Sequence, residues 1–336
     1  MEITPLVWGL TILLIVGLLA FDFVFHVRQA HIPSIREAAV WSALYIGAAL
    51  AFGLVFLAMG DPALATEYYA GYVTEKALSV DNLFVFLVII ASFNVPREDQ
   101  QKVLLFGIVF ALIVRTAFIL VGAGLIHAFS DVFYLFGIIL LVTAVQLLKK
   151  GAAGEDAAEE ADNIIIRLAR RFLHTTDHYD GDRLVTRVDG KRMLTPMLLV
   201  MVAIGGTDIL FAVDSIPAIY GLTQEPYIVF AATAFSLMGL RQLYFLIDGL
   251  LDRLVHLSYG LAVILGFIGV KLVLHALHEN NLPFINGGEN VPVPEISTGL
   301  SLIVIVAVLA VTVISSLLTS AARARREDEE HAAQSS

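Results

Sequence analysis

Two short stretches, "EKALSVDN" at 75–82 and "DILFAVDS" at 208–215, place acidic side chains inside strongly apolar sequence. Each stretch contains two acids that are six residues apart. In each, Val precedes the second acid, and a residue with a neutral side-chain oxygen follows it. These candidate metal ligands are Glu75, Asp81, Asn82, Asp208, Asp214 and Ser215. Their oxygen atoms predict a site for a cation, and they would repel an anion.

Carboxylates inside a membrane need compensation. Each charged form costs roughly 2.5–3.5 kcal/mol at the centre of a bilayer. Four such groups cost roughly 10 kcal/mol, which is comparable with the stability of a whole protein. A bound cation, protonation, or pairing with Lys76, Arg115 and Arg241 would offset this cost. Structural ion pairs between helices are therefore the alternative to an ion site. The repetition of the acids and the neutral oxygens beside them favour the ion site.

Helical geometry separates the two acids of each stretch. Residues i and i+7 share a helix face, so Glu75 aligns with Asn82, and Asp208 aligns with Ser215. The second acid of each pair points roughly 120° away, toward a different neighbour.

Proline and glycine modify the second stretch. Pro217 cannot donate a backbone hydrogen bond to Val213, which leaves a carbonyl oxygen close to Asp214. Gly205 and Gly206 favour a locally irregular or closely packed helix. Carboxylate, amide, hydroxyl and carbonyl oxygens suit Mg²⁺, Ca²⁺ or Mn²⁺ better than Zn²⁺ or Cu⁺, and the 336 residues include no Cys.

The elements that carry these residues are membrane helices. The chain is 58% hydrophobic and only 15% charged, which is typical of a polytopic membrane protein. The N-terminal apolar segment lacks a basic region and a cleavage site, so it reads as a retained helix. The nine predicted spans lie at about 4–26, 37–59, 67–93, 102–126, 131–148, 194–219, 227–249, 256–277 and 297–319.

The basic residues predict the orientation. With the N-terminus outside, 17 of the 21 Lys and Arg fall in cytoplasmic loops or the cytoplasmic tail, and none falls in an outer loop. The remaining four, Lys76, Arg115, Arg241 and Lys271, lie within spans. The net charge of -10 is spread over the loops and does not suggest nucleic-acid binding.

Landmarks recur in the two halves of the chain. Arg115 and Arg241 lie within spans, 126 residues apart, and "YLFGIILLVTAVQLL" from Tyr134 resembles "YGLAVILGFIGVKLV" from Tyr259. Spans 3–5 and 6–8 therefore predict two three-helix repeats. An odd number of helices per repeat inverts the second one, an architecture common in secondary transporters.

The predicted fold class is an all-α membrane protein, and its predicted parts follow in chain order. They are two transmembrane helices (1–66), the first repeat (67–148), a cytoplasmic loop (149–193), the second repeat (194–278), an outer loop with the last transmembrane helix (279–320), and a disordered cytoplasmic tail (321–336). Within the loop we expect an amphipathic helix in "IIIRLARRFLH" and a β-hairpin around Asp189–Gly190.

The stretches "EKALSVDNLFVF", "TDILFAVDSIPAIY" and "GLRQLYFL" together resemble the TerC family of integral membrane proteins. The resemblance extends over nearly the whole chain, through the "YDG" and "DGK" loop to "LPFINGGE". It implies efflux of manganese, and of other divalent cations, across the bacterial cytoplasmic membrane, with the six acidic-motif residues binding the ion. The sequence departs from the family pattern at Gly205, where many members carry Glu, and at Thr233, where Asn is frequent.

Several other residues have simpler interpretations. We expect Asp22 to reach water at a helix end, and Lys76 to pair with an acid from another helix. Arg115 and Arg241 are expected to neutralise acids or bind carbonyls of the opposite repeat. His275 and His278, in "HALHE", are read as interfacial histidines, with metal collection as the alternative.

The sequence contains no nucleotide-binding motif and no catalytic triad, so we expect a transporter and no enzyme. The expected cargo is a divalent cation, with Mn²⁺ favoured over Ca²⁺ and others, and no tightly bound cofactor. The alternative is a membrane scaffold of a metal or tellurite stress response that recruits protein partners through the 149–193 loop. Tellurium oxyanion efflux does not fit the acidic site.

Overall fold

The computed structural model describes residues 3–27, 33–129, 131–153, 176, 179–181, 183–188, 191–247, 254–280, 282–283 and 285–334. Helices dominate these residues. The first half contains α1 (Pro5–Asp22), the π-helical turn η1 (Phe23–Val27), α2 (Ile35–Ala58), α3 (Pro62–Ser92), α4 (Gln100–Ala128) and α5 (Val132–Ala153). The second half contains β1 (Val185–Val188), β2 (Lys191–Leu194), α7 (Pro196–Tyr220), α8 (Pro226–Leu237), α9 (Leu240–Ile247), α10 (Leu257–His278), the short turn η3 (Asn286–Gly288) and α11 (Thr298–Gln334).

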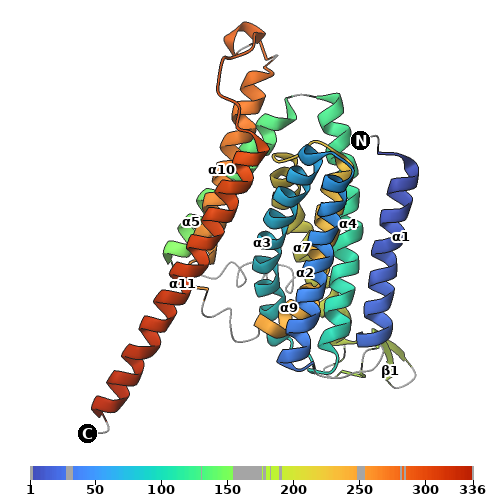
Figure 1. The fold of residues 1–336 in the computed structure, drawn as a ribbon. Coiled ribbons are helices and arrows are strands. Elements are labelled where there is room, and N and C mark those ends of the chain that lie inside the picture. Colours follow the sequence, from blue (N-terminus) through green and yellow to red (C-terminus); the bar gives the residue numbers. More distant parts are fainter. Residues whose placement is uncertain are drawn as a thin grey trace.

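The helices form one bundle with two distinct ends (Figure 1). The start of α1 and the connection between α10 and α11 lie at one end, and the β1–β2 hairpin and the C-terminal end of α11 lie at the other. The segments that the sequence assigns to the outside thus share one end of the bundle, and those assigned to the cytoplasm share the other.

Eight helical segments of the described chain are long and apolar enough to cross a membrane. They are Pro5–Phe25, Ile35–Ala58, Gln100–Ala128, Val132–Lys149, Pro196–Tyr220, Pro226–Leu246, Leu257–His278 and Thr298–Ala322. The missing ninth span is α3, which is long enough at 31 residues but carries the charges of the first acidic motif. It connects α2 to α4 inside the bundle, so its charged side chains meet protein on most sides.

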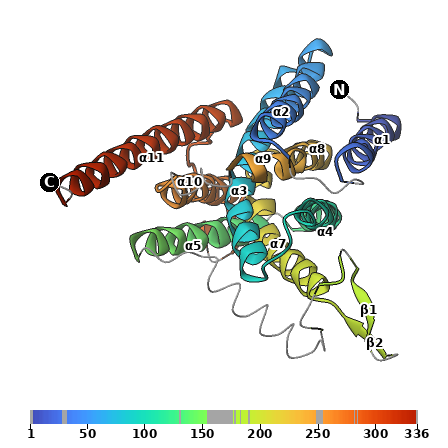
Figure 2. The ribbon, with the colours of Figure 1, turned by 90° about the horizontal axis from the view of Figure 1, so that it is seen from below.

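The centre of the bundle is α3. It packs against α2, α7, α8, α9, α10 and α11, and the view along the bundle shows it surrounded by other helices (Figure 2). Away from α3, the most extensive contacts pair α5 with α10 and α4 with α7. A two-fold relation between the predicted repeats would exchange α3–α8 with α4–α7 and would map α5–α10 onto itself. The packing is therefore of the kind that the predicted inverted repeat requires, and the repeat itself stays a prediction.

The predicted span 227–249 is interrupted in the structure. Residue Met238 is extended (φ -64°, ψ 139°) and Gly239 has φ +75°, so α8 ends and α9 starts anew. One span earlier, Gly205 and Gly206 predicted a locally irregular or closely packed helix. The second alternative is confirmed: α7 runs unbroken from Pro196 to Tyr220, and a Cβ at Gly205 would lie 2.9 Å from the ring of Phe110.

The structure confirms the hairpin. Strands β1 and β2 pair antiparallel, with Val188 opposite Lys191. The expected amphipathic helix at 164–174 lies outside the described residues. The tail differs from the expected disorder, because α11 continues as a helix to Gln334. Its alanines, glutamates and arginines have high helix propensity, which favours extension of the preceding span.

Candidate metal-ion pathway

A buried arginine joins the two acidic motifs. Arg115 of α4 has 0% exposure and lies between an acid from α3 and an acid from α7. Its Nη1 donates to Glu75 Oε2 at 2.5 Å, and its Nη2 donates to Asp208 Oδ1 at 3.5 Å. Both acids are also buried, so the charge of the guanidinium acts on them with little solvent screening.

Two neutral ligand candidates lie beside this ion-pair cluster. With the Asn82 amide oriented to satisfy its neighbours, its oxygen accepts from Arg115 Nη2 at 2.9 Å and its nitrogen donates to the Leu78 carbonyl at 3.2 Å. The Ser215 hydroxyl lies close to the Glu75 carboxylate. The helix faces that carry Glu75 with Asn82 and Asp208 with Ser215 therefore meet at Arg115, as their predicted alignment allows.

The second acids of the motifs line a cavity of about 280 Å³ between α3, α5, α7 and α10. Its polar lining consists of Asp81, Asn82, Thr143, Gln146, Asp214 and Ser215. Thr143 of α5 donates to Asp214 Oδ1 at 2.8 Å, which fixes one carboxylate oxygen of the cavity wall. Sequence reasoning did not find Thr143 or Gln146, because neither belongs to an acidic motif.

Buried oxygen atoms without hydrogen-bond partners occur in the same cluster. Within the described residues they are Glu75 Oε1, Asp208 Oδ2 and Ser215 Oγ. Buried polar atoms are nearly always paired with protein, water or an ion. The donor chemistry, two carboxylates at the cavity with amide and hydroxyl oxygens, fits a hard divalent cation that keeps part of its water shell.

The six predicted ligands do not form one shell. Asn82 and Ser215 line the cavity with Asp81 and Asp214, whereas Glu75 and Asp208 contact Arg115. No group of three or more His, Cys, Asp or Glu in the described part of the chain is placed to hold a metal ion. The arrangement is thus a cavity with two carboxylates next to a cluster with two more.

Lys76 has partners of another kind than expected. Its Nζ donates to the backbone carbonyls of Ser236 (3.0 Å) and Met238 (3.2 Å), at the break between α8 and α9. The expectation of an acidic partner is wrong. One position away from Glu75 on a helix, the Lys76 side chain points roughly 100° away from the ion-pair cluster.

Arg241 is not the structural counterpart of Arg115. It binds Asp22 of α1 through two nitrogens, at 2.6 and 3.2 Å, and also contacts Gln101. Tyr45 and Gln242 donate to the same carboxylate. Asp22 therefore does not reach water, because this network encloses it at 6% exposure. The charge-pairing role predicted for Arg241 is present, at a site that links α1 to the bundle.

The two departures from the family pattern lie in packed surroundings. At Gly205 the ring of Phe110 occupies the space next to the backbone. Thr233 of α8 has 0% exposure, and its hydroxyl has no hydrogen-bond partner among the described residues.

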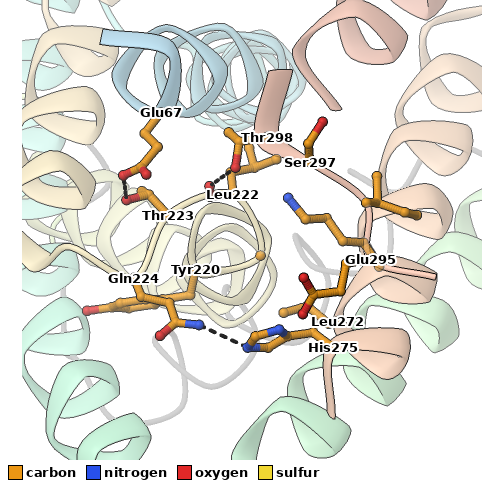
Figure 3. Close-up of a pocket in the computed structure, with 13 residues that line it drawn as sticks. Glu67, Tyr220, Leu222, Thr223, Gln224, Leu272, His275, Glu295, Ser297 and Thr298 are labelled. Carbon is orange, nitrogen blue, oxygen red and sulfur yellow. Dashed lines mark hydrogen bonds between the residues drawn. The ribbon is translucent and has the colours of Figure 1, made fainter. Parts of the chain in front are cut away.

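A second cavity, of about 500 Å³, lies at the end of the bundle opposite the hairpin. Figure 3 shows Glu67, Thr223 and Gln224 on one side of it and His275 and Glu295 on the other. Thr223 donates to Glu67 at 2.6 Å, and Gln224 lies 3.0 Å from the His275 ring nitrogen. Sequence analysis singled out His275 but not Glu67, since a lone acid near a helix start is common. The cavity therefore has ionisable side chains in its wall, at the end of the bundle that the sequence assigns to the outside.

The chain is similar in sequence to a known family and to several bacterial membrane proteins. The model of the integral membrane protein TerC family matches residues 60–324. An uncharacterized membrane protein of Mycobacterium tuberculosis is 61% identical over 326 residues, which cover 97% of this chain and 82% of the relative. The putative membrane-bound redox modulator Alx of Escherichia coli is 38% identical over 281 residues, covering 81% and 86%. No solved structure matches.

Proposed function

Because the chain belongs to the TerC family of integral membrane proteins, we propose that it exports divalent metal cations, with manganese as the favoured cargo. The observation that carries the proposal is the cavity lined by the second acid of each motif. Asp81 and Asp214 come from different halves of the chain, and neutral oxygens complete the lining. The membrane concerned is the bacterial cytoplasmic membrane.

The chemistry of the lining favours a hard cation. Two carboxylates neutralise a divalent charge, and the amide and hydroxyl oxygens replace part of the water shell. No thiolate is available, since the chain contains no Cys. Manganese is preferred over other hard cations on the family resemblance alone.

The neighbouring cluster supplies a route for exchange. Glu75 and Asp208 each contact Arg115 through one oxygen and leave the other buried oxygen without a hydrogen bond. In the proposed cycle an arriving cation competes with the guanidinium for these carboxylates. Asn82 belongs to both places, because it lines the cavity and bonds Arg115.

The name of the Escherichia coli relative refers to redox modulation. This chain has no Cys and so offers no thiol for disulfide exchange. Manganese is itself redox-active, so its export would connect the proposed transport with the redox modulation in the relative's name.

The test is Mn²⁺ transport by purified protein in liposomes. We expect Asp81→Asn and Asp214→Asn each to lower the initial rate at least tenfold, because each removes one of the two charges that face the cavity. Asp180→Asn, in an exposed ion pair with Arg183 near the hairpin, is the matched control and should transport at the normal rate.

Melting temperatures of the variants show whether they remain folded. Full transport by the folded Asp81→Asn/Asp214→Asn double variant would refute the proposed site. Absence of transport by the unmodified protein would refute the transporter and leave the scaffold.

A further inference from the structure

The break between α8 and α9 presents backbone oxygens to the interior of the bundle. In the Pro226–Leu246 segment that contains it, 89% of an 18-residue apolar stretch is buried, the largest such share among the eight candidate spans. A helix leaves its last four carbonyls without intrahelical partners, and these oxygens carry the negative end of the helix dipole. At the end of α8 such carbonyls have no bulk water to bind.

A cation belonging to the chain occupies this position. The Lys76 ammonium, from α3, lies 3.0 Å from the Ser236 carbonyl oxygen and 3.2 Å from that of Met238. The hydroxyls of Ser79 and Ser236 are fully buried and lie 3.5 Å from each other across the same α3–α8 contact. Among the described residues the ammonium thus donates to two main-chain carbonyl oxygens and to no carboxylate.

Such a set of neutral oxygens does not distinguish an ammonium group from a small monovalent metal cation by charge. In transporters with interrupted helices, unwound carbonyls and half-helix C-terminal ends coordinate Na⁺. A Lys ammonium is a compact point charge on a flexible stem, so it can take the place of such an ion.

We propose that the α8–α9 break is a monovalent-cation site that the protein fills with its own Lys76 ammonium. The site needs no dissolved ion as long as Lys76 is present. It becomes an alkali-cation site when the side chain is shortened. The consequence for transport, a cycle that runs without Na⁺ or K⁺, rests on the proposed function; the site itself does not.

The experiment is a thermal unfolding scan of the purified chain in NaCl, KCl and choline chloride at equal ionic strength. For Lys76→Ala we expect a melting temperature higher by about 5 °C in NaCl or KCl than in choline chloride, at salt well above the dissociation constant. The shift should saturate with salt concentration. The unmodified protein should melt at the same temperature in all three salts.

Two variants control for other effects of the substitution. Lys271→Ala removes an ammonium from another membrane helix, α10, where it donates to the Ser301 hydroxyl and not to helix-end carbonyls. Lys76→Arg keeps a positive charge at the break. Neither should respond to the choice of salt.

The proposal is overturned if Lys76→Ala melts at one temperature in all three salts, or if the unmodified protein shows the same shift. Should Lys76→Ala not fold, Lys76→Gln, which is shorter than Lys and adds an oxygen, is scanned and judged in the same way. Since no divalent ion is present, this result is independent of metal transport.

Transport in liposomes then tests the consequence. Lys76→Ala should move Mn²⁺ at least tenfold faster with Na⁺ or K⁺ than with choline, whereas the unmodified protein should be indifferent. Equal rates for Lys76→Ala in all salts would overturn the link between the site and the cycle. A lack of transport by the unmodified protein would instead count against the proposed function and leave the melting result standing.

Discussion

Arg115 and Lys76 are two cations inside the same helix bundle that take different kinds of partner. The guanidinium is a planar fork that contacts Glu75, Asp208 and Asn82 together. The ammonium is a point charge that lies between two carbonyls. The shape of each cation therefore matches the geometry of its acceptors.

Removing the guanidinium should destabilise the protein. Arg115→Gln leaves two buried carboxylates without their cation, a change that typically costs about 3–5 kcal/mol. We expect a lower melting temperature, and partial recovery in Arg115→Gln/Glu75→Gln, where one carboxylate is also neutralised. Arg183→Gln is the control, because Arg183 is 71% exposed in its pair with Asp180. An Arg115→Gln protein as stable as the unmodified one would contradict the structural role.

Removing the hydroxyl that positions Asp214 should weaken ion binding. Thr143→Val deletes the 2.8 Å hydrogen bond to the carboxylate, and losing such a supporting contact typically costs 10–100-fold in metal affinity. We expect a KM for Mn²⁺ raised by about 10-fold or more in liposomes, with the melting temperature nearly unchanged. Thr116→Val is the control, because its hydroxyl donates within its own helix, to Leu112. An unaltered KM for Thr143→Val would show that Thr143 does not contribute to ion binding.

At the scale of elements, the bundle is tied together by side chains that cross between helices. Asp22 and Arg241 join α1 to α9, and Tyr45 adds α2 to the same network. Thr11 and Tyr227 join α1 to α8 through a 2.7 Å hydrogen bond. Helix α1 lies N-terminal to the part of the chain that matches the family model, and these contacts fix it to the helices that carry the sites.

The break between α8 and α9 depends on one backbone conformation. Gly239 has φ +75°, and a Cβ there would lie 2.9 Å from Tyr45 Cβ. We expect Gly239→Ala to lower the melting temperature through both backbone strain and steric contact. Gly60→Ala is matched in backbone, with φ +81°, but no atom lies within 4 Å of its Cβ, so it should bear only the strain of about 1–2 kcal/mol. Equal losses in the two variants would show that packing at the break contributes nothing.

At the scale of the whole molecule, the two ends of the bundle predict the orientation in the membrane. The hairpin lies at the end that the basic residues assign to the cytoplasm, and the 279–297 connection lies at the other. The chain contains no Cys, so single introduced cysteines report without background.

In intact cells, a membrane-impermeant thiol reagent should label Asn290→Cys. It should label Val185→Cys, at a hairpin position with 46% exposure, only after permeabilisation. The unmodified protein, which has no Cys, gives the background level of labelling. The opposite pattern would reverse the topology and turn the proposed exporter into an importer.

The sequence by itself determined the membrane class, the positions of eight of the nine predicted spans, the hairpin and the residues of both acidic motifs. These follow from local properties, since hydropathy, charge and helical periodicity act within about 20 residues along the chain. The alignment of Glu75 with Asn82 and of Asp208 with Ser215 also needed only the geometry of one helix.

Only the tertiary structure decided which partner each charge has and where a helix breaks. Arg115 is 40 residues from Glu75 and 93 from Asp208, and Arg241 is 219 from Asp22. No local pattern encodes such pairs, because a buried charge takes whatever acceptor the packing brings within reach. For the same reason Lys76, which follows an acid in the sequence, donates to backbone carbonyls at the end of α8. Thr143 likewise contacts Asp214 although no motif in its own segment predicts this.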